Sequence, residues 1–329
     1  MSKSVIIIGA GVVGLACGRE LSSKGYEVFI AEKEQYIATQ TSARNSGVIH
    51  AGIYYPADSL KAKLCIRGKK LLYEYCEEFN VTHARTKKMI VATTSEETQI
   101  LLKLKDTAAK NGVHLDLISS HDAVEREPNL FAVSALVSPT TGIVDAAGLA
   151  TSFQHQAELN GASLALETKI TKITQNSKIL VSGTSGGEEF EAEFDILINA
   201  AGHGAHELTQ SYWPEAPPLP KNFAKGNYFS IAGKAPFQTL IYPVPGTESL
   251  GIHYTIDTDG RGQLGPNVQW VNQPTYEVDK NLEAEFRNAA RTYWPGVEDR
   301  ELIPGYSGIR PRVEAKDFVI HSKDNIITL

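Results

Sequence analysis

Three glycines and one acid near the start of the chain are suited to binding a dinucleotide. Gly9, Gly11 and Gly14 form a Gly-x-Gly-x-x-Gly pattern. In such a pattern the first glycine permits a tight turn, the second lets backbone approach a pyrophosphate, and the third lets helix and strand pack closely. Glu32 follows after residues 15–31, where a carboxylate would bind a ribose 2′-hydroxyl and repel a 2′-phosphate. The pattern therefore predicts binding of an ADP moiety.

A strand, a helix and a second strand are needed to position these residues. The run Val5–Ile8 is apolar and β-branched, which is typical of a buried parallel strand, and the residues after Gly14 suit a helix. Residues 26–31 read as a second buried strand that ends at Glu32. The pyrophosphate would then lie at the helix N-terminus, which offers free N–H groups. The alternative is a chance glycine pattern in an ordinary turn between a strand and a helix.

Composition excludes several classes of protein. The 329 residues are 42% hydrophobic and 21% charged, which is ordinary for a globular protein, and the net charge of −6 gives no reason to expect nucleic acid as a partner. The apolar N-terminal run is short and glycine-rich, so we expect no transmembrane segment. The three cysteines, Cys17, Cys65 and Cys76, have no metal-ligand spacing. We expect reduced thiols, no metal site and a cytoplasmic location.

Hydrophobic periodicity predicts an α/β chain, α+β overall, with two interleaved lobes. Helices are expected at 60–79, 96–111, 147–160 and 279–293, and strands at 89–93, within 163–199, at 194–199 and across 222–271. We predict a discontinuous Rossmann-like nucleotide-binding lobe formed by residues 1–80, 146–220 and 305–329. A mainly antiparallel β-sheet substrate lobe would comprise residues 81–145 and 221–304.

Eight segments make the sequence recognisable. They are residues 41–55 (TSARNSGVIHAGIYY), 61–68, 141–145, 199–202, 241–245, 250–253, 264–267 and 305–311 (GYSGIRP). With these segments the chain resembles the FAD-dependent oxidoreductases of the D-amino-acid-oxidase type, and within them the L-2-hydroxyglutarate dehydrogenase/oxidase group. The likeness covers essentially the whole chain in the family's order. The stretches 42–56 and 305–311 are its most specific parts.

The resemblance implies a cofactor, a reaction and a substrate. FAD would accept a hydride from L-2-hydroxyglutarate, or from a related small 2-hydroxy acid, and the product would be 2-oxoglutarate. A small dicarboxylate is thus the expected partner, and the electron acceptor is left open between a quinone, oxygen and a carrier. Mitochondrial and peripheral membrane locations also stay open. The alternatives are an amine or amino-acid oxidase of the same family, a catalytically impaired flavoprotein remnant, and an NAD-dependent dehydrogenase.

By the same resemblance, a set of residues would bind FAD. The polar stretch 41–47 would lie along the flavin diphosphate and ring edge, and small residues at 201–202 would approach the cofactor. The complete set is Gly9, Gly11, Gly14, Glu32, Lys33, Thr41, Ser42, Arg44, Asn45, Ser46, Gly47, Ala201 and Gly202. Family members continue past a final strand, here expected at 325–329, into a turn and helix that help hold the flavin. The sequence ends at Leu329, before this turn and helix, so we expect these 329 residues to retain FAD weakly.

Four residues are candidates for catalysis. A neutral histidine suits acceptance of the hydroxyl proton, and His50 and His253 both lie in segments that resemble the family. Arg310 would bind a substrate carboxylate bidentately, because a planar guanidinium fixes direction as well as charge. Tyr54 and Tyr55 are expected on a strand, where neighbouring side chains face opposite ways, so that one would line the cavity. Tyr55 is the candidate of the pair.

Overall fold

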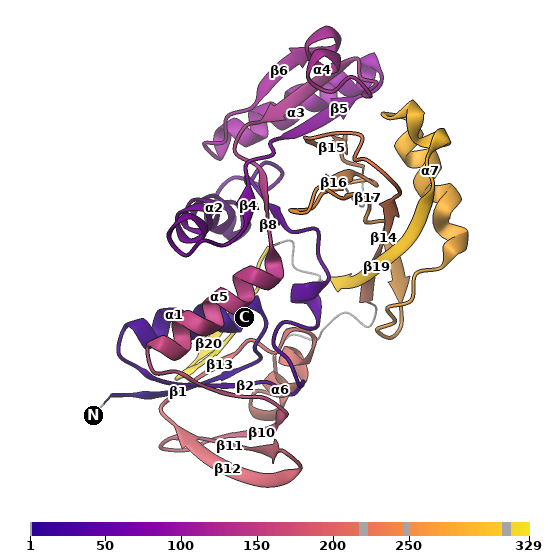
Figure 1. The fold of residues 1–329 in the computed structure, drawn as a ribbon. Coiled ribbons are helices and arrows are strands. Elements are labelled where there is room, and N and C mark those ends of the chain that lie inside the picture. Colours follow the sequence, from indigo (N-terminus) through magenta and orange to yellow (C-terminus); the bar gives the residue numbers. More distant parts are fainter. Residues whose placement is uncertain (1, 217–222, 247–249, 311–316) are drawn as a thin grey trace. The chain divides into compact units, whose positions relative to one another are not determined.

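The chain folds as two units, each built from segments that are distant in sequence (Figure 1). The computed structural model describes residues 2–216, 223–246, 250–310 and 317–329. Unit 1 comprises Met1–Arg44, Ala146–Lys221 and Pro311–Leu329, and unit 2 comprises Asn45–Asp145 and Asn222–Arg310. Two interleaved units were expected, but the boundaries differ from those predicted.

Residues 45–80 and 305–310 belong to unit 2, although the sequence analysis assigned them to the nucleotide-binding lobe. Strand pairing explains the difference. Strand β3 (Val48–Ile49) pairs with β8 (Gly142–Val144), which in turn pairs with β4 (His83–Ala84). Strand β19 (Leu302–Arg310) pairs with β14 (Phe223–Ile231) along most of its length. These long-range pairings cannot be deduced from local periodicity.

Unit 1 is organised around a six-stranded sheet in the order β20-β21-β13-β1-β2-β9. These strands are β1 (Ser4–Ile8), β2 (Glu27–Ala31), β9 (Ser163–Ala165), β13 (Ile196–Asn199), β20 (His321–Lys323) and β21 (Ile326–Thr328). All pairs in it are parallel except β20 with β21. The carboxyl ends of β1, β13 and β2 therefore meet at one edge of the sheet.

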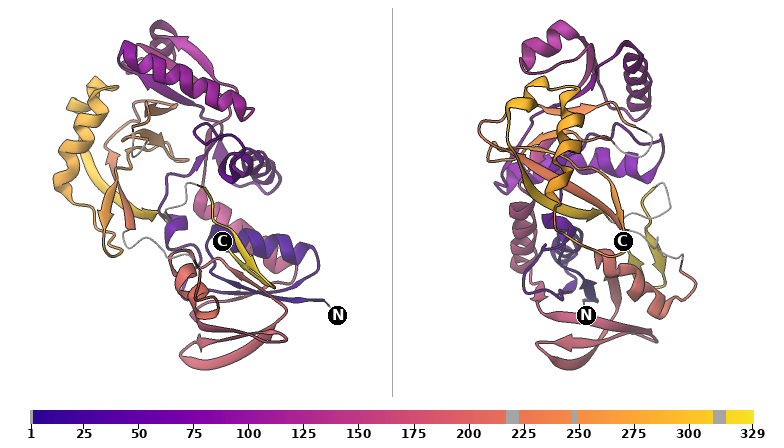
Figure 2. Two further views of the ribbon diagram at one scale, coloured as in Figure 1. Left: turned by 180° about the vertical axis from the view of Figure 1, so that it is seen from behind. Right: turned by 90° about the vertical axis from the view of Figure 1, so that its right-hand side faces the viewer.

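The alternation of side chains along β1 produces the layers of unit 1. Val5 and Ile7 pack in one cluster with the helices α1 and α5, and Ile6 and Ile8 pack in another with a three-stranded meander. Figures 1 and 2 show these two layers on opposite faces of the sheet. The elements are α1 (Val12–Ser23), α5 (Ala146–Leu159), β10 (Thr168–Gln175), β11 (Ile179–Ser185) and β12 (Glu188–Phe194), followed by α6 (Ala205–Tyr212).

Unit 2 contains a nine-stranded sheet in the order β18-β14-β17-β16-β15-β5-β7-β6, with β19 added beside β14. Its further strands are β5 (Lys88–Ala92), β6 (Asp116–Ser119), β7 (Ser134–Ser138), β15 (Leu240–Pro243), β16 (Tyr254–Ile256), β17 (Gly262–Leu264) and β18 (Gln269–Val271). Strands β5 and β15 pair in parallel, and the other described pairs are antiparallel. A mainly antiparallel sheet was predicted for this lobe.

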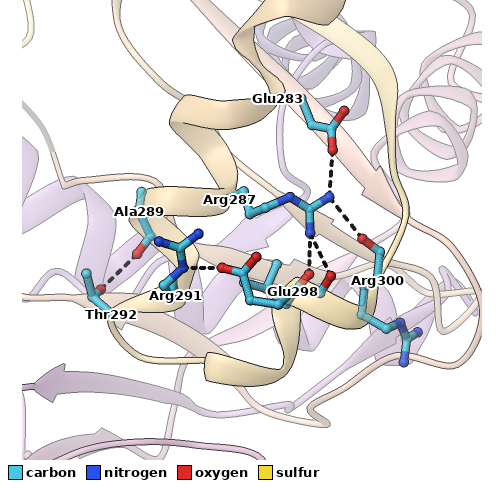
Figure 3. Close-up of polar contacts among 8 residues, drawn as sticks. Glu283, Arg287, Ala289, Arg291, Thr292, Glu298 and Arg300 are labelled. Atoms are coloured by element: carbon cyan, nitrogen blue, oxygen red, sulfur yellow. Dashed lines mark hydrogen bonds and ion pairs between the residues drawn. The ribbon is translucent and has the colours of Figure 1, made fainter.

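The α-helices in the described part of unit 2 are α2 (Leu60–Glu78), α3 (Ser95–Lys110), α4 (Ser120–Arg126) and α7 (Glu283–Arg291). The helix expected at 279–293 is shorter than predicted, because Asp279 caps a 3-10 turn at 280–282 before α7 begins. After α7 the chain turns through a second 3-10 segment, Pro295–Asp299. Figure 3 shows Arg287 of α7 reaching that segment.

Candidate functional site

The glycine turn of unit 1 is packed so tightly that side chains cannot replace Gly9 or Gly14. A Cβ at Gly14 would lie 1.9 Å from the carbonyl oxygen of Gly9, which is shorter than any contact between these atoms. Gly9 itself has φ +103°, and a Cβ there would lie 2.6 Å from the oxygen of Ala200. A Cβ at Gly11 would meet the Ser42 hydroxyl at 3.1 Å. The turn thus brings bare backbone to the start of α1.

Glu32 ends β2 beside this turn and is held rigidly by backbone. Its side chain is 8% exposed. One carboxylate oxygen accepts a hydrogen bond from Ala10 N at 2.7 Å and the other accepts from Glu34 N at 3.0 Å. A carboxylate has about four lone-pair sites, so two remain for further donors such as ribose hydroxyls. Lys33, next in sequence, is exposed and lies 3.6 Å from the Glu34 carboxylate.

Two further segments of unit 1 converge on the glycine turn. The Ser42 hydroxyl accepts from Val12 N at 3.0 Å, at the first turn of α1. The turn after β13 holds Ala201 and Gly202, the latter with φ +54°, and it meets Gly9 through residues 200–201. Thr41 and His203 approach to 3.4 Å. Unit 1 therefore brings together most of its predicted cofactor residues, namely Gly9, Gly11, Gly14, Glu32, Thr41, Ser42, Ala201 and Gly202. Arg44 is the last residue of the first segment of unit 1.

The remaining part of the polar stretch, Asn45 to Gly47, belongs to unit 2. Asn45 Oδ1 accepts from Gly47 N at 2.8 Å, and the Asn45 carbonyl accepts from the Tyr306 hydroxyl at 2.6 Å. Ser46 hydrogen-bonds the Tyr228 hydroxyl at 2.9 Å, and the Tyr228 and Tyr306 rings stack with centroids 4.5 Å apart. The role of these three residues in binding cofactor stays a prediction.

His253 lies immediately before β16 and is held on two sides. Its ring stacks on Tyr242 of β15, with centroids 3.8 Å apart and an angle of 18° between the planes. Nδ1 lies 2.9 Å from the carbonyl oxygen of Gly251. Since a carbonyl only accepts, Nδ1 carries the hydrogen, and in the neutral ring Nε2 is the proton acceptor. The fold thus leaves the free lone pair of the neutral His253 ring on Nε2.

His50 follows β3 in unit 2, and its carbonyl accepts from the Cys65 thiol of α2 at 3.4 Å. Burial lowers the pKa of His50 to about 3, and the positive charge of Lys88 acts in the same direction. Burial also lowers the pKa of His253 to about 3, where Lys88, His50 and Arg310 add to it and the bond to Gly251 opposes it. Both predicted histidines are therefore neutral at pH 7 and influence each other electrostatically.

Lys88 is a residue that the sequence analysis missed. Its side chain is fully buried, and Nζ lies 4.7 Å from the centre of the Tyr54 ring and 4.4 Å from that of Tyr242. No hydrogen-bond partner for Nζ exists among the described residues. A lysine opening a buried strand (KMIVA) was the available signal, because a lysine is almost never fully buried without a partner.

Arg310 and the two tyrosines complete the description of predicted residues. Arg310 ends β19, donates from Nη2 to the carbonyl of Asn267 at 2.8 Å, and contributes to the electrostatics of His253. The expectation that Tyr54 and Tyr55 lie on a strand is wrong, because β3 ends at Ile49. Instead the Tyr55 carbonyl accepts from the Asn111 side chain at 2.8 Å, while the Tyr54 ring faces Lys88.

Comparison with known proteins bears directly on this site. A family model described as "FAD dependent oxidoreductase" matches residues 4–329. The chain is 36% identical to "L-2-hydroxyglutarate dehydrogenase, mitochondrial" of Arabidopsis thaliana, over 97% of this chain and 76% of that protein. It is 33% identical to "L-2-hydroxyglutarate dehydrogenase" of Indibacter alkaliphilus, over 91% of this chain and 75% of that protein.

Solved structures share the fold. "L-alpha-Glycerophosphate Oxidase from Mycoplasma pneumoniae", solved with FAD bound, superposes with a TM-score of 0.89 at 24% identity, covering 99% of this chain and 88% of that one. Glycine oxidase from Geobacillus kaustophilus gives a TM-score of 0.84 at 22% identity, over 99% and 89% of the two chains. Among the described residues, no helix has the length and apolar character needed to cross a bilayer.

Proposed function

Because this chain belongs to the family of FAD-dependent oxidoreductases, we propose that it oxidises L-2-hydroxyglutarate to 2-oxoglutarate. A related small 2-hydroxy acid is the second candidate substrate. The observation that carries the proposal is the identity of 33–36% to two proteins named L-2-hydroxyglutarate dehydrogenase, which extends over 91–97% of this chain. The neutral His50 and His253, with the Arg310 guanidinium acting on His253, suit an anionic alcohol.

The residues of unit 1 fit an FAD dinucleotide. A Cβ at Gly9 or Gly14 would clash with backbone in the glycine turn, and the fixed Glu32 carboxylate keeps capacity for ribose hydroxyls. Gly9, Gly11, Gly14, Glu32 and Ser42 would hold the adenosine and pyrophosphate portions. When bound, FAD supplies a two-electron acceptor for the hydride from C2 of the substrate.

The residues of unit 2 would handle the hydroxyl proton and the carboxylate. His253 Nε2 is the better prepared proton acceptor, since Nδ1 is committed to Gly251. His50 is the second candidate. Arg310 would orient the carboxylate next to the reacting carbon, because hydride transfer requires the C2–H bond to be aimed. Tyr55 remains a candidate for lining the pocket.

An anaerobic titration tests this proposal. The FAD-loaded protein is mixed with L-2-hydroxyglutarate, and the visible flavin bands are followed. We expect the bands to bleach with one equivalent of substrate and 2-oxoglutarate to form in equal amount. Bleaching by an amino acid instead would support an amine oxidase, and no bleaching by either class would support the impaired flavoprotein. The D-enantiomer is the control for stereospecificity.

Substituting the two histidines identifies the proton acceptor. We expect His253→Gln to slow flavin reduction by about 10²–10⁴-fold, the usual effect of losing a general base, while FAD binding is retained. His50→Gln is the matched second variant. If both variants reduce flavin at the wild-type rate in stopped-flow experiments, histidine has no part in the proton transfer.

We also propose a cytoplasmic location, supported by three free cysteines. The Arabidopsis relative is named mitochondrial, so a mitochondrial location is the alternative, together with peripheral membrane association. Cell fractionation decides among them. The reoxidation rate of the reduced protein with oxygen, a soluble quinone and a protein carrier identifies the acceptor.

A further inference from the structure

Lys88 is enclosed in a way that requires an explanation. Lys88 is the first residue of β5, and in the sheet it lies opposite Leu240 of β15 and Ser138 of β7. Its amine stands over two tyrosine rings and makes no hydrogen bond to any described residue. Rings of this kind attract a cation through their faces but do not replace the water that an ammonium loses on burial. A fully buried charge without an anion is costly, so the site is suited to an amine that charges only when an anion arrives.

The groups that face Lys88 contain no resident anion. Tyr54 approaches from the segment after β3, Tyr242 from β15, and Cys65 from α2, where burial raises the pKa of the thiol. No carboxylate forms an ion pair with Lys88 in the described part of the chain, and the electrostatic influence of Lys88 extends to His50 and His253. These two histidines are neutral at pH 7, so the described side chains named for this cluster are cationic or neutral.

We propose that Lys88 makes this cluster selective for a second carboxylate, by taking up a proton when a dicarboxylate binds beside His50 and His253. The inference rests on the proposed function for the location of the substrate. Arg310 provides for one carboxylate, and the charge on Lys88 compensates the other through space across Tyr54 and Tyr242. Lys88 is therefore a positioning residue, because its enclosed amine acts without touching the substrate. Two charges need not touch for this effect, because the dielectric constant of the protein interior is lower than that of water and weakens their attraction less.

The titration of the Lys88 amine determines how dicarboxylate affinity should change with pH. Burial lowers the pKa of Lys88 to about 7, and a bound anion would raise it again. Below the pKa that the amine has without ligand, Lys88 is already protonated and contributes its full attraction to the bound anion. Above that pKa the amine must take up a proton on binding, so the affinity decreases as the pH increases. Dicarboxylate affinity should thus be constant below about pH 6 and decline about tenfold per pH unit above pH 7.

The test measures binding of two five-carbon probes to the FAD-loaded protein, glutarate with two carboxylates and pentanoate with one. Isothermal titration calorimetry in buffers of different ionisation enthalpy gives both the affinity and the number of protons taken up. For the wild type we expect glutarate binding at pH 8 to take up close to one proton, and pentanoate binding much less.

Three variants separate charge from packing. Lys88→Met keeps the side-chain length without the charge, and should bind glutarate at least about tenfold more weakly at pH 6, without proton uptake and with little change for pentanoate. Lys88→Arg is permanently charged, so it should bind glutarate with no pH dependence between 6 and 8. Lys103→Met, which removes an exposed charge of α3, should behave as the wild type.

Several results would overturn the inference. These are wild-type proton uptake in Lys88→Met, equal loss of affinity for both probes, and no glutarate binding to the wild type. The proposed function can fail separately. If L-2-hydroxyglutarate leaves the flavin oxidised while glutarate binds with proton uptake that depends on Lys88, the inference stands and the substrate assignment falls. If the protein oxidises L-2-hydroxyglutarate but Lys88→Met binds glutarate as the wild type does, the substrate assignment stands and the inference about Lys88 falls.

Discussion

Among the residues of the nucleotide turn, Gly9 and Gly14 leave no room for a side chain, whereas Gly11 can be replaced to test the turn. Gly11 has an ordinary backbone conformation, so the strain of a positive φ does not complicate its replacement. We expect Gly11→Val to abolish stoichiometric FAD binding, because the branched side chain would project where pyrophosphate must approach, beside Ser42. The measurement is the flavin-to-protein ratio after purification. Gly68→Ala, on helix α2 of unit 2, is the control for general damage, because its φ is ordinary and an added Cβ there would meet no atom within 4 Å.

Arg310 is tested by keeping its charge and changing its shape. A lysine supplies a point charge on a flexible stem, whereas the guanidinium fixes a carboxylate in direction. We expect Arg310→Lys to raise the KM and to slow flavin reduction by about 10²-fold, since misplacement by about an ångström has that effect. Stopped-flow reduction at increasing substrate concentration separates the two effects. An unchanged limiting rate and affinity would make Arg310 a structural residue that only ties β19 to Asn267.

At the scale of elements, the join between α7 and the following 3-10 segment depends on Arg287. Its guanidinium donates to the carbonyls of Val297 and Arg300 and pairs with Glu283, with 19% of the side chain exposed (Figure 3). We expect Arg287→Met to lower the free energy of unfolding by about 1–3 kcal/mol, because it leaves partly buried carbonyls without donors.

Arg291 on the same helix provides the matched control. It pairs with Glu298 but is 52% exposed, so water screens the pair. Arg291→Met should change the free energy of unfolding by less than about 1 kcal/mol. Urea denaturation of both variants gives the comparison. Equal losses would show that the carbonyl contacts of Arg287 contribute no more than a surface ion pair.

At the scale of the whole molecule, the chain leaves and re-enters each unit through widely separated segments. Unit 1 needs β21 from the far end of the chain, which pairs with β13, and unit 2 needs β14 and β19 as well as β5. Long-range pairing of this kind requires large loops to close before contacts form, which slows folding. Each unit therefore depends on almost the full length of the sequence.

The two buried histidines make the stability of the folded chain dependent on pH. Both have pKa values of about 3 when folded, against 6.5 ordinarily, so the unfolded chain binds more protons between these values. The contribution of the histidines to stability should be constant above about pH 6.5 and fall as the pH decreases, by about 1.4 kcal/mol per pH unit for His253 and less for the half-buried His50. The lowered pKa of Lys88 acts separately, above about pH 7, where it makes stability rise with pH.

Urea denaturation at pH 7 and pH 5 measures this dependence. His253→Gln should reduce the difference between the two pH values, because one of the groups that must remain neutral is gone. His121→Gln, at an exposed position of α4, should leave the difference unchanged. A wild type equally stable at both pH values would contradict neutral burial of the histidines.

Local features of the sequence were sufficient for the nucleotide turn. The apolar run of β1, the glycines and Glu32 lie within a short segment, and their geometry follows from backbone sterics that act between near neighbours. The family-like segments likewise indicated FAD and drew attention to His50, His253 and Arg310. Helices with strong periodicity, such as α2 and α3, were predicted to within one or two residues.

Tertiary structure alone decided the surroundings of the histidines and the unit boundaries. Lys88, Tyr54, Tyr242 and His253 come from different elements. The pairing of β5 with β15 brings Lys88 beside Tyr242, the pairing of β15 with β16 brings His253 to the same place, and Tyr54 approaches from the segment after β3. The pKa values near 3 depend on burial by these partners, and burial is a property of the packed chain. For the same reason, residues 45–80 could not be assigned to unit 2 from periodicity, which records the spacing of side chains along one element but not the strand it will pair with.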